Sequence, residues 1–354
     1  MKKIKVLIVE DSLVSQKLLK GILDSDPVIE VVAIAQNGIE AIDCVNRFKP
    51  DVVSMDINMP VMNGIEATRK IMSTNPVPIV IVSSIYNSVE IEAAIKELEA
   101  GAVIVLPKPF GPGHPEFAKS SIRYRSTLKL MSGVKVEKRA VSLQSRLESK
   151  QTDNINAGKK ESIICNKPNI VAIGASAGGP EALKTILMKL NKDFPLPILI
   201  VQHIDKSFSE GFANWLNFYS KIPVKIAENG EKIRYGNVYI SPGGTNMSVN
   251  RGGVILLSNE NENSLHKPSI NLLFKSAGSV YGSGVIALLL SGMGNDGATE
   301  LKNLKNMGAC TFVQDEKTSL VYGMPGEAVK LDAACRILTP DDMVNEINNL
   351  FNKI

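Results

Sequence analysis

Short apolar runs alternate with stretches of helical periodicity in both halves of this chain, and the pattern breaks down between the halves. The apolar runs of the first half are candidate strands at residues 6–9, 28–34, 52–55, 78–82 and 103–106. The stretches between them repeat apolar residues at helical spacing, as at Val14, Leu18 and Ile22. Short buried strands that alternate with amphipathic helices predict a parallel sheet covered by helices on both faces.

The alternation resumes at Asn169 and continues through the second half. Candidate strands lie at 170–173, 197–201, 238–240, 254–257, 285–290 and 309–313, and candidate helices near 180–190, 208–219, 269–279 and 298–307. From about 132 to 165 the chain is basic, rich in serine and poor in large apolar residues, which predicts a flexible linker. We therefore predict an α/β protein of two doubly wound parallel-sheet domains, 1–125 and 168–354, joined by a linker at 126–167.

Composition excludes several classes of protein. A hydrophobic fraction of 44% and a charged fraction of 21% are typical of a soluble globular chain. No apolar run approaches the roughly 20 residues of a membrane helix, and the N-terminus lacks the long apolar region of a signal peptide, so we expect no membrane insertion. The four cysteines are scattered without a C-x-x-C pair, which favours a reducing, cytoplasmic location and no zinc site.

The net charge of +4 is unevenly distributed. Segment 119–150 contains nine Lys or Arg and two Glu, which gives +7 and leaves −3 for the rest of the chain. We interpret this segment as a solvated linker. The second half offers no helix-turn-helix and no basic reading helix, so we expect no nucleic-acid binding.

Polar residues follow the candidate strands of the first half in a fixed order. Glu10 and Asp11 follow the first strand, Asp56 the third, Ser83 the fourth and Lys108 the fifth. The carboxyl ends of parallel strands meet at one edge of a sheet, so these side chains are expected to converge. Three carboxylates suit a hard cation such as Mg²⁺, and a lysine with a hydroxyl suits a transferred phosphoryl group.

Residues 1 to about 125 resemble a response-regulator receiver domain, which has a flavodoxin-like fold. The resemblance rests on the strings Val-Glu10-Asp11-Ser, Met-Asp56-Ile-Asn-Met-Pro60, Val-Ser83-Ser and Leu-Pro-Lys108-Pro109. It implies that Asp56 accepts a phosphoryl group from a histidine kinase. It also implies that Mg²⁺ is held by Glu10, Asp11, Asp56 and the carbonyl of Asn58, and that Ser83 and Lys108 contact the phosphoryl oxygens.

A second group of chemically useful residues lies in the second half. The stretch Ile170-Val-Ala-Ile-Gly-Ala-Ser176-Ala-Gly-Gly-Pro180 is typical of a strand, a glycine-rich turn and a helix start. Ser176 therefore lies on a corner that suits a nucleophile, although a phosphate-binding turn has the same composition. His203 follows the next candidate strand, and Asp296 lies in a glycine-rich loop after a later one. If these strands are parallel, the three side chains gather as nucleophile, base and orienting carboxylate; His266, in a turn-like context, is the alternative base.

Residues from about 168 to 354 resemble the catalytic domain of the chemotaxis protein-glutamate methylesterase family, usually called CheB. The resemblance rests on the strings Ile-Gly-Ala-Ser176-Ala-Gly-Gly-Pro, Val-Gln-His203, Ser-Pro-Gly-Gly244, His266-Lys-Pro-Ser269 and Ser-Gly-Met293-Gly-Asn-Asp296-Gly-Ala. It implies a Rossmann-like hydrolase in which Ser176 attacks the methyl ester of a glutamyl side chain on a chemoreceptor. His203 takes the serine proton, Asp296 orients His203, and no cofactor takes part. The backbone N–H of Met293 holds the oxyanion, with Gly294 and Ala177 in the same region. Methanol leaves and water releases the acyl-serine; related enzymes also deamidate receptor glutamines.

Several positions depart from the family pattern without removing a member of the triad. Ala177 stands where a hydroxyl residue is frequent, Asp205 with its neighbour Ile204 where Met-Pro is common, Asn246 where histidine is frequent, and Asn271 where aspartate is frequent. These departures leave the rate and the preferred receptor open. The alternative function is a phosphorylation-dependent binding or scaffold regulator whose esterase site has decayed.

The pairing of a receiver with a hydrolase predicts a switch. We expect the unphosphorylated receiver to pack over the Ser176 loop, and phosphorylation of Asp56 to shift the population toward an uncovered site.

Overall fold

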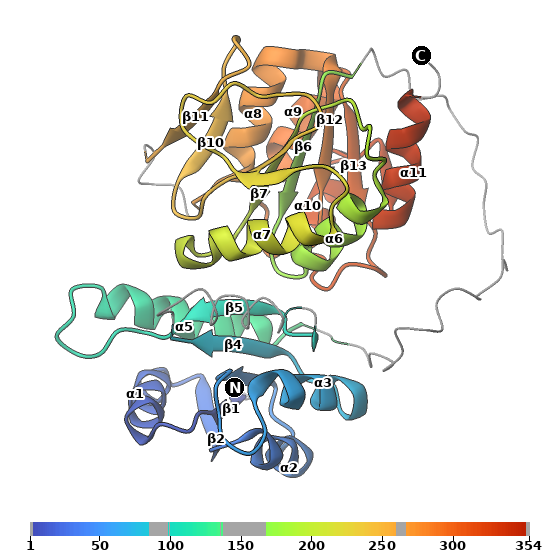
Figure 1. Cartoon of the computed structure of the whole chain (residues 1–354). Coiled ribbons are helices and arrows are strands. Elements are labelled where there is room, and N and C mark those ends of the chain that lie inside the picture. Colours follow the sequence, from blue (N-terminus) through green and yellow to red (C-terminus); the bar gives the residue numbers. More distant parts are fainter. Residues whose placement is uncertain are drawn as a thin grey trace, which may run out of the picture.

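The computed structural model describes residues 3–84, 98, 100–134, 136, 168–259 and 267–351. These residues form two α/β domains (Figure 1). The C-terminal domain lies over the side of the N-terminal domain that carries β4, β5 and α5. The predicted fold class is confirmed.

The N-terminal domain contains a five-stranded parallel sheet of order β2-β1-β3-β4-β5. Its elements are β1 (Ile4–Val9), α1 (Leu13–Asp24), β2 (Ile29–Ala35), α2 (Gly38–Phe48), β3 (Val52–Met55), α3 (Gly64–Thr74), β4 (Ile79–Ser83), β5 (Ile104–Pro107) and α5 (Phe117–Met131). All five candidate strands of the first half are confirmed within one or two residues. Because α5 runs to Met131, the boundary predicted at residue 125 falls inside this helix.

The C-terminal domain contains a seven-stranded parallel sheet of order β14-β13-β12-β6-β7-β9-β8. Its strands are β6 (Ile170–Ala175), β7 (Ile198–Gln202), β8 (Val224–Ile226), β9 (Val238–Ile240), β12 (Val285–Leu289), β13 (Cys310–Gln314) and β14 (Arg336–Leu338). Its α-helices are α6 (Gly179–Lys189), α7 (Ser209–Tyr219), α8 (Ile270–Tyr281), α9 (Ala298–Asn306), α10 (Met324–Lys330) and α11 (Pro340–Phe351). Strand β6 lies between β12 and β7, so the strand that leads to Ser176 is central.

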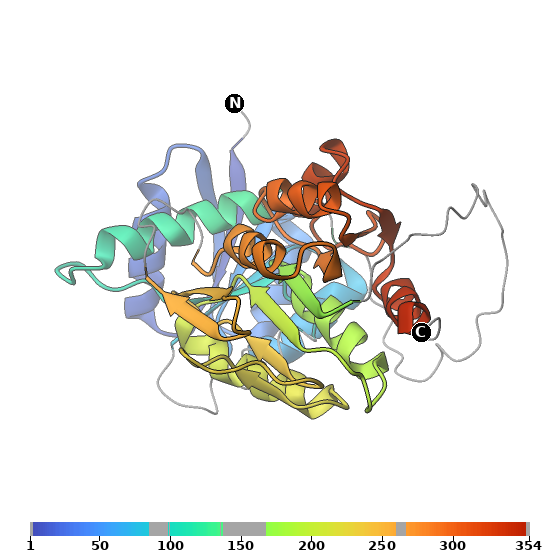
Figure 2. The same ribbon diagram turned by 90° about the horizontal axis from the view of Figure 1, so that it is seen from above.

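Helices cover both faces of this sheet, as the view in Figure 2 shows. Apolar residues of α6, α7 and α11 pack in one core cluster with the sheet, and those of α8, α9 and α10 pack in the other. One face of α6, formed by Leu183, Ile186 and Leu187 with Leu190 directly after the helix, is buried, with at most 1% of each residue exposed. The periodicity of the chain therefore decides which side of each helix faces the sheet.

Several elements differ from the prediction. The candidate strand at 254–257 is β11 (Ile255–Ser258), which pairs antiparallel with β10 (Asn246–Val249) in a separate hairpin and does not join the main sheet. Strands β8 and β14 have three residues each, and each includes a charged residue, Lys225 or Arg336, so neither forms the uninterrupted apolar run that β9 has. Helix α11 has a clear apolar face, which includes Met343 and Ile347, and the sequence analysis missed it.

Two further observations concern the whole chain. Among the described residues, no helix is both long enough and apolar enough to span a membrane. Cys44 and Cys335 are free thiols, whereas Cys310 is disulfide-bonded, which the scattered cysteine spacing did not predict.

Candidate active site

Ser176 lies on the corner between the central strand β6 and helix α6, as predicted. Its backbone N–H donates to the Ser291 carbonyl at 3.0 Å, and its carbonyl accepts from the Gly179 N–H at 2.8 Å. The residue is 7% exposed. Gly178 follows with φ of +78°, a conformation that side chains rarely adopt, and a Cβ there would lie 2.5 Å from the Cβ of Leu320. The turn is therefore tight, and it holds the serine at the start of α6.

His203 follows β7, the strand next to β6. The register pairs Ala175 with Gln202, and the His203 N–H donates to the Ala175 carbonyl at 2.9 Å. The parallel pairing thus brings Ser176 and His203 to one sheet edge. Gln202, which is 3% exposed, donates from Nε2 to the carbonyls of Ser176 at 2.9 Å and of His203 at 3.2 Å. This bridge was missed from sequence, although Gln202 stands in the string that identified His203.

Asp296 reaches His203 from the loop between β12 and α9. Its Oδ2 lies 3.0 Å from the His203 Nε2 and accepts the Ile270 N–H at 2.7 Å, while its Oδ1 accepts the Asn271 N–H at 3.0 Å. Burial alone would raise the pKa of Asp296, but the hydrogen bond and charge of His203, together with these two backbone N–H groups, outweigh burial and lower it. Asp296 is therefore an ionised partner for the imidazole. His266 lies outside the described residues.

The loop 291–294 faces the Ser176 corner. A Cβ on Gly292 would lie 2.7 Å from the Cβ of Ser176, so only glycine allows this approach. The Gly292 N–H donates to Val321 and its carbonyl accepts from Gly323 and Met324, which ties the loop to the start of α10. The N–H groups of Ala177 and Met293 donate no hydrogen bond to any described residue. Such backbone donors suit an oxyanion. Gly294, with φ of +83°, is exposed beside them.

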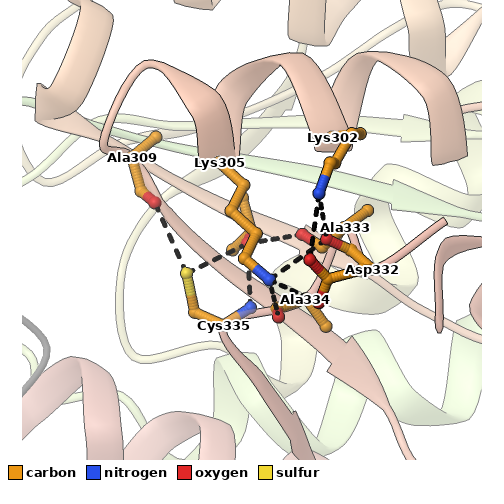
Figure 3. A network of polar contacts seen from close by, with 8 residues as sticks. Lys302, Lys305, Ala309, Asp332, Ala333, Ala334 and Cys335 are labelled. Carbon is orange, nitrogen blue, oxygen red and sulfur yellow. Dashed lines mark hydrogen bonds and ion pairs between the residues drawn. The ribbon is translucent and has the colours of Figure 1, made fainter. Parts of the chain in front are cut away.

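Helix α9, which begins directly after this loop, is fixed at its far end by a separate network (Figure 3). Lys302 and Lys305 both pair with the carboxylate of Asp332, at 3.0 and 2.8 Å. Lys305 also donates to the Ala334 carbonyl at 2.9 Å. The hydrogen bonds from both lysines lower the pKa of Asp332 to about 2. The network joins the C-terminal turn of α9 to the segment between α10 and β14.

The acidic residues predicted in the N-terminal domain converge at one sheet edge. Carboxylate oxygens of Glu10, Asp11 and Asp56 lie within 4.8 Å of one another. Lys108 Nζ lies 2.6 Å from Glu10 Oε2 and 2.9 Å from Asp56 Oδ2. Burial raises the pKa of both Glu10 and Asp56, because it disfavours the charged carboxylates. Three hard oxygen donors gathered at one point fit a divalent cation such as Mg²⁺, which would relieve their mutual repulsion.

Ser83 and Asn58 are the two other residues predicted at this edge. Ser83 ends β4, is 2% exposed and donates from Oγ to the Ser84 carbonyl at 3.2 Å. Asn58 is exposed two residues after Asp56. Burial disfavours the charged amine of Lys108, but Asp56 and Glu10 outweigh burial and raise its pKa. Lys108 is thus a fixed positive charge beside Asp56.

The two domains meet next to the Ser176 corner and the loop 291–294. Ala177 belongs to the same hydrophobic cluster as Leu106 and Leu128 of the N-terminal domain, and Met293 packs against that cluster. Phe208, which is 1% exposed, joins a second cluster of the N-terminal domain. Arg123 of α5 forms an ion pair with Asp205. The N-terminal domain is therefore contacted by Ala177, directly after Ser176, and by Asp205 and Phe208, shortly after His203.

Comparisons with known proteins agree with this architecture. Residues 171–347 match the family model described as CheB methylesterase, and residues 6–115 match the response regulator receiver domain. The chain is 45% identical over 98% of its length to a protein-glutamate methylesterase/protein-glutamine glutaminase of Geobacter metallireducens, covering 99% of that relative. It is 45% identical over 98% of its length to a protein of the same name from Nitrosospira multiformis, covering 97% of that relative.

A solved structure resembles the C-terminal domain. The crystal structure of the Thermotoga maritima CheB methylesterase catalytic domain has 32% sequence identity and a TM-score of 0.50, and the match covers 52% of this chain and all of that one. Together with the two family models and the relatives that match along nearly the whole chain, it supports one conclusion. The chain belongs to the CheB methylesterase family and carries a response-regulator receiver domain ahead of the catalytic domain.

Proposed function

We propose that this protein hydrolyses methyl esters of glutamate side chains on methyl-accepting chemotaxis receptors, and deamidates receptor glutamines by the same chemistry. The observation that carries the proposal is the pair of His203 and Asp296, 3.0 Å apart, at the sheet edge where Ser176 leaves β6. Relatives that match nearly the whole chain are named for both activities. A decayed binding module is not favoured, because the chain keeps Ser176, His203 and Asp296 and its relatives are named for both activities.

The mechanism follows from the roles of the three side chains. Ser176 Oγ attacks the ester carbonyl while His203 accepts its proton, and Asp296 stabilises the imidazolium that forms. Because the His203 Nε2 faces Asp296, Nδ1 is the nitrogen that serves Ser176. The N–H groups of Met293 and Ala177 bind the oxyanion, and Gly294 lies next to Met293 in the same loop. Collapse expels methanol, which takes its proton from His203, and attack by water on the acyl-serine restores glutamate. Ammonia leaves in the same way from glutamine.

The receiver domain supplies control. Asp56 accepts the phosphoryl group from a chemotaxis histidine kinase, and Lys108 and Ser83 contact the phosphoryl oxygens. Glu10, Asp11, Asp56 and the Asn58 carbonyl would hold Mg²⁺, which neutralises charge during phosphoryl transfer. The supporting observation is the carboxylate cluster with Lys108 at its side. We place the enzyme in the cytoplasm, together with the kinase that supplies the phosphoryl group.

The inactive state follows from the domain contact. Ala177 and Met293, both next to the reacting groups, pack against the receiver, so a receptor helix cannot reach Ser176 without displacing it. Phosphorylation of Asp56 shifts the population toward a separated arrangement.

Mass spectrometry of methylated receptor fragments tests the proposed reaction. Incubation with the phosphorylated protein should convert glutamyl methyl esters and selected glutamines to glutamate. Ser176→Ala should leave both unchanged, whereas Ser279→Ala, at an exposed serine on α8, should behave as wild type. Fragments that remain methylated in the presence of wild-type protein would contradict the proposal.

A further inference from the structure

Two helix N-termini cap each other beside Asp296. Asp296 accepts hydrogen bonds from the N–H groups of Ile270 and Asn271, in the first turn of α8. It also accepts one from the Ser269 hydroxyl, at 3.3 Å. In return, the Asn271 Oδ1 accepts the N–H groups of Gly297 at 3.1 Å and Glu300 at 3.4 Å. Each segment thus supplies the oxygen atoms that the other helix start needs for its free N–H groups.

Helix α9 depends on this exchange. Its N-cap is Gly297, which has no side chain and makes no side-chain cap hydrogen bond. The cap is supplied from α8 by Asn271, and it is made to the residue that directly follows Asp296. Loss of the Asn271 amide would leave N–H groups of α9 unsatisfied and would free the end of the loop that carries Asp296.

The cap is also neutral. An amide carbonyl satisfies the α9 N–H groups without adding a second negative charge beside Asp296, whereas a carboxylate at position 271 would add one. The other charged side chains that the structure describes on α8 and α9 have other partners or are exposed, and Lys302 and Lys305 pair with Asp332. The carboxylate of Glu300 accepts from Asn303, Lys267 donates to the Asn259 carbonyl, and Lys275 of α8 is exposed. His203 is the ionisable side chain that lies within hydrogen-bond distance of the Asp296 carboxylate.

We propose that Asn271 is a positioning residue of the esterase: its amide holds the Asp296 loop against α8, and its neutrality leaves the Asp296–His203 pair without a competing carboxylate. The inference rests on the proposed function, because it assigns the role of Asn271 through the triad. Asn271 does not touch the reacting atoms.

Three variants of the full-length protein separate the two roles. Asn271→Asp keeps an oxygen at the cap and adds a charge, and Asn271→Ala removes the cap. Asn250→Asp is the matched control, because the Asn250 Oδ1 also accepts two backbone N–H groups, those of Gly252 and Val254, in the turn of the β10–β11 hairpin. Methanol release from methylated receptor fragments is measured as kcat and KM from pH 5 to 9.

Asn271→Asp should move the acid limb of the pH profile upward by about one unit or less, because a second carboxylate favours the imidazolium of His203. The plateau kcat of Asn271→Asp should stay within about threefold of the wild-type value. Asn271→Ala should lower kcat by roughly tenfold with little change in KM and no shift of the limb. Asn250→Asp should match wild type. A limb that stays in place in Asn271→Asp, or a plateau kcat of Asn271→Ala within twofold of wild type, would overturn the inference.

A readout without substrate separates this inference from the proposed function. NMR titration of ¹³C-labelled histidine follows the His203 ring, assigned by the resonance that disappears in His203→Gln. The titration midpoint should rise in Asn271→Asp and stay in place in Asn250→Asp; equal midpoints would refute the role of charge even if the wild type proved inactive on every receptor fragment. If the wild type were inactive but the His203 midpoint still rose in Asn271→Asp, the result would count against the proposed function and not against this inference.

Discussion

The ion pair between Arg123 and Asp205 links the receiver to the segment beside His203, and Arg123→Ala tests whether it holds the inactive arrangement. The Arg123 side chain is 47% exposed and that of Asp205 22% exposed. An ion pair of this exposure contributes about 0.2–1 kcal/mol. Its loss should therefore raise the fraction of molecules whose domains are separated, and with it the rate of the unphosphorylated protein, by roughly 1.4- to 5-fold.

The assay is methanol release without and with acetyl phosphate, expressed as the ratio of the two rates. Burial would raise the pKa of Asp205, but hydrogen bonds from Ser207 and Arg123 outweigh burial and lower it, so the pair stays charged at neutral pH. High salt should reduce the difference between wild type and Arg123→Ala, because exposed pairs are screened. Lys119→Ala is the control, since Lys119 lies on the same helix and pairs with a near neighbour in the sequence, Glu116.

Restoration by charge exchange completes the test. The double variant Arg123→Asp with Asp205→Arg should return the ratio toward wild type. An Arg123→Ala ratio equal to that of wild type would refute the reasoning that this ion pair stabilises the closed arrangement.

Three further predictions concern other parts of the molecule. Asp296→Asn should lower kcat by roughly 10³- to 10⁴-fold, because the imidazolium loses its partner; methanol release measures it, and activity near wild type would exclude Asp296 from the triad. Asp56→Asn should raise the Mg²⁺-free melting temperature at pH 7, since the fold raises the pKa of Asp56 above its unfolded value of 3.8 and the charged form is the costly one. The gain should vanish below pH 3.8, where the carboxyl is protonated in both states; an equal gain at every pH would contradict the charge explanation. Leu183→Ala should destabilise the C-terminal domain by about 2–5 kcal/mol in urea unfolding, because this fully buried side chain leaves a cavity. A loss below 1 kcal/mol would contradict the packing described.

Most of the candidate site could be predicted because it depends on strand ends. Apolar runs locate the strands, and a parallel sheet brings their carboxyl ends to one edge, so His203 and Lys108 could be placed near Ser176 and Asp56 respectively without coordinates. Gly-rich strings likewise indicated the turns, since few other residues fit them.

The interactions that support the site could not be predicted in the same way. The bonds from Asn271 to Gly297 and from Gln202 to the Ser176 carbonyl depend on the direction of a side chain within the packed structure, which leaves no periodic signal. The pair of Arg123 and Asp205 depends on how two separately folded sheets meet. Strand β8 is recognised only from its partner, because three residues do not define a period and Lys225 interrupts the apolar run.

Methanol release from methylated receptor fragments by wild type and Ser176→Ala, each with and without acetyl phosphate, tests the central claim most directly. The account predicts release by wild type that rises on phosphorylation, and no release by Ser176→Ala under either condition. Release by Ser176→Ala at the wild-type rate, or no release by wild-type protein that is phosphorylated on Asp56, would contradict it.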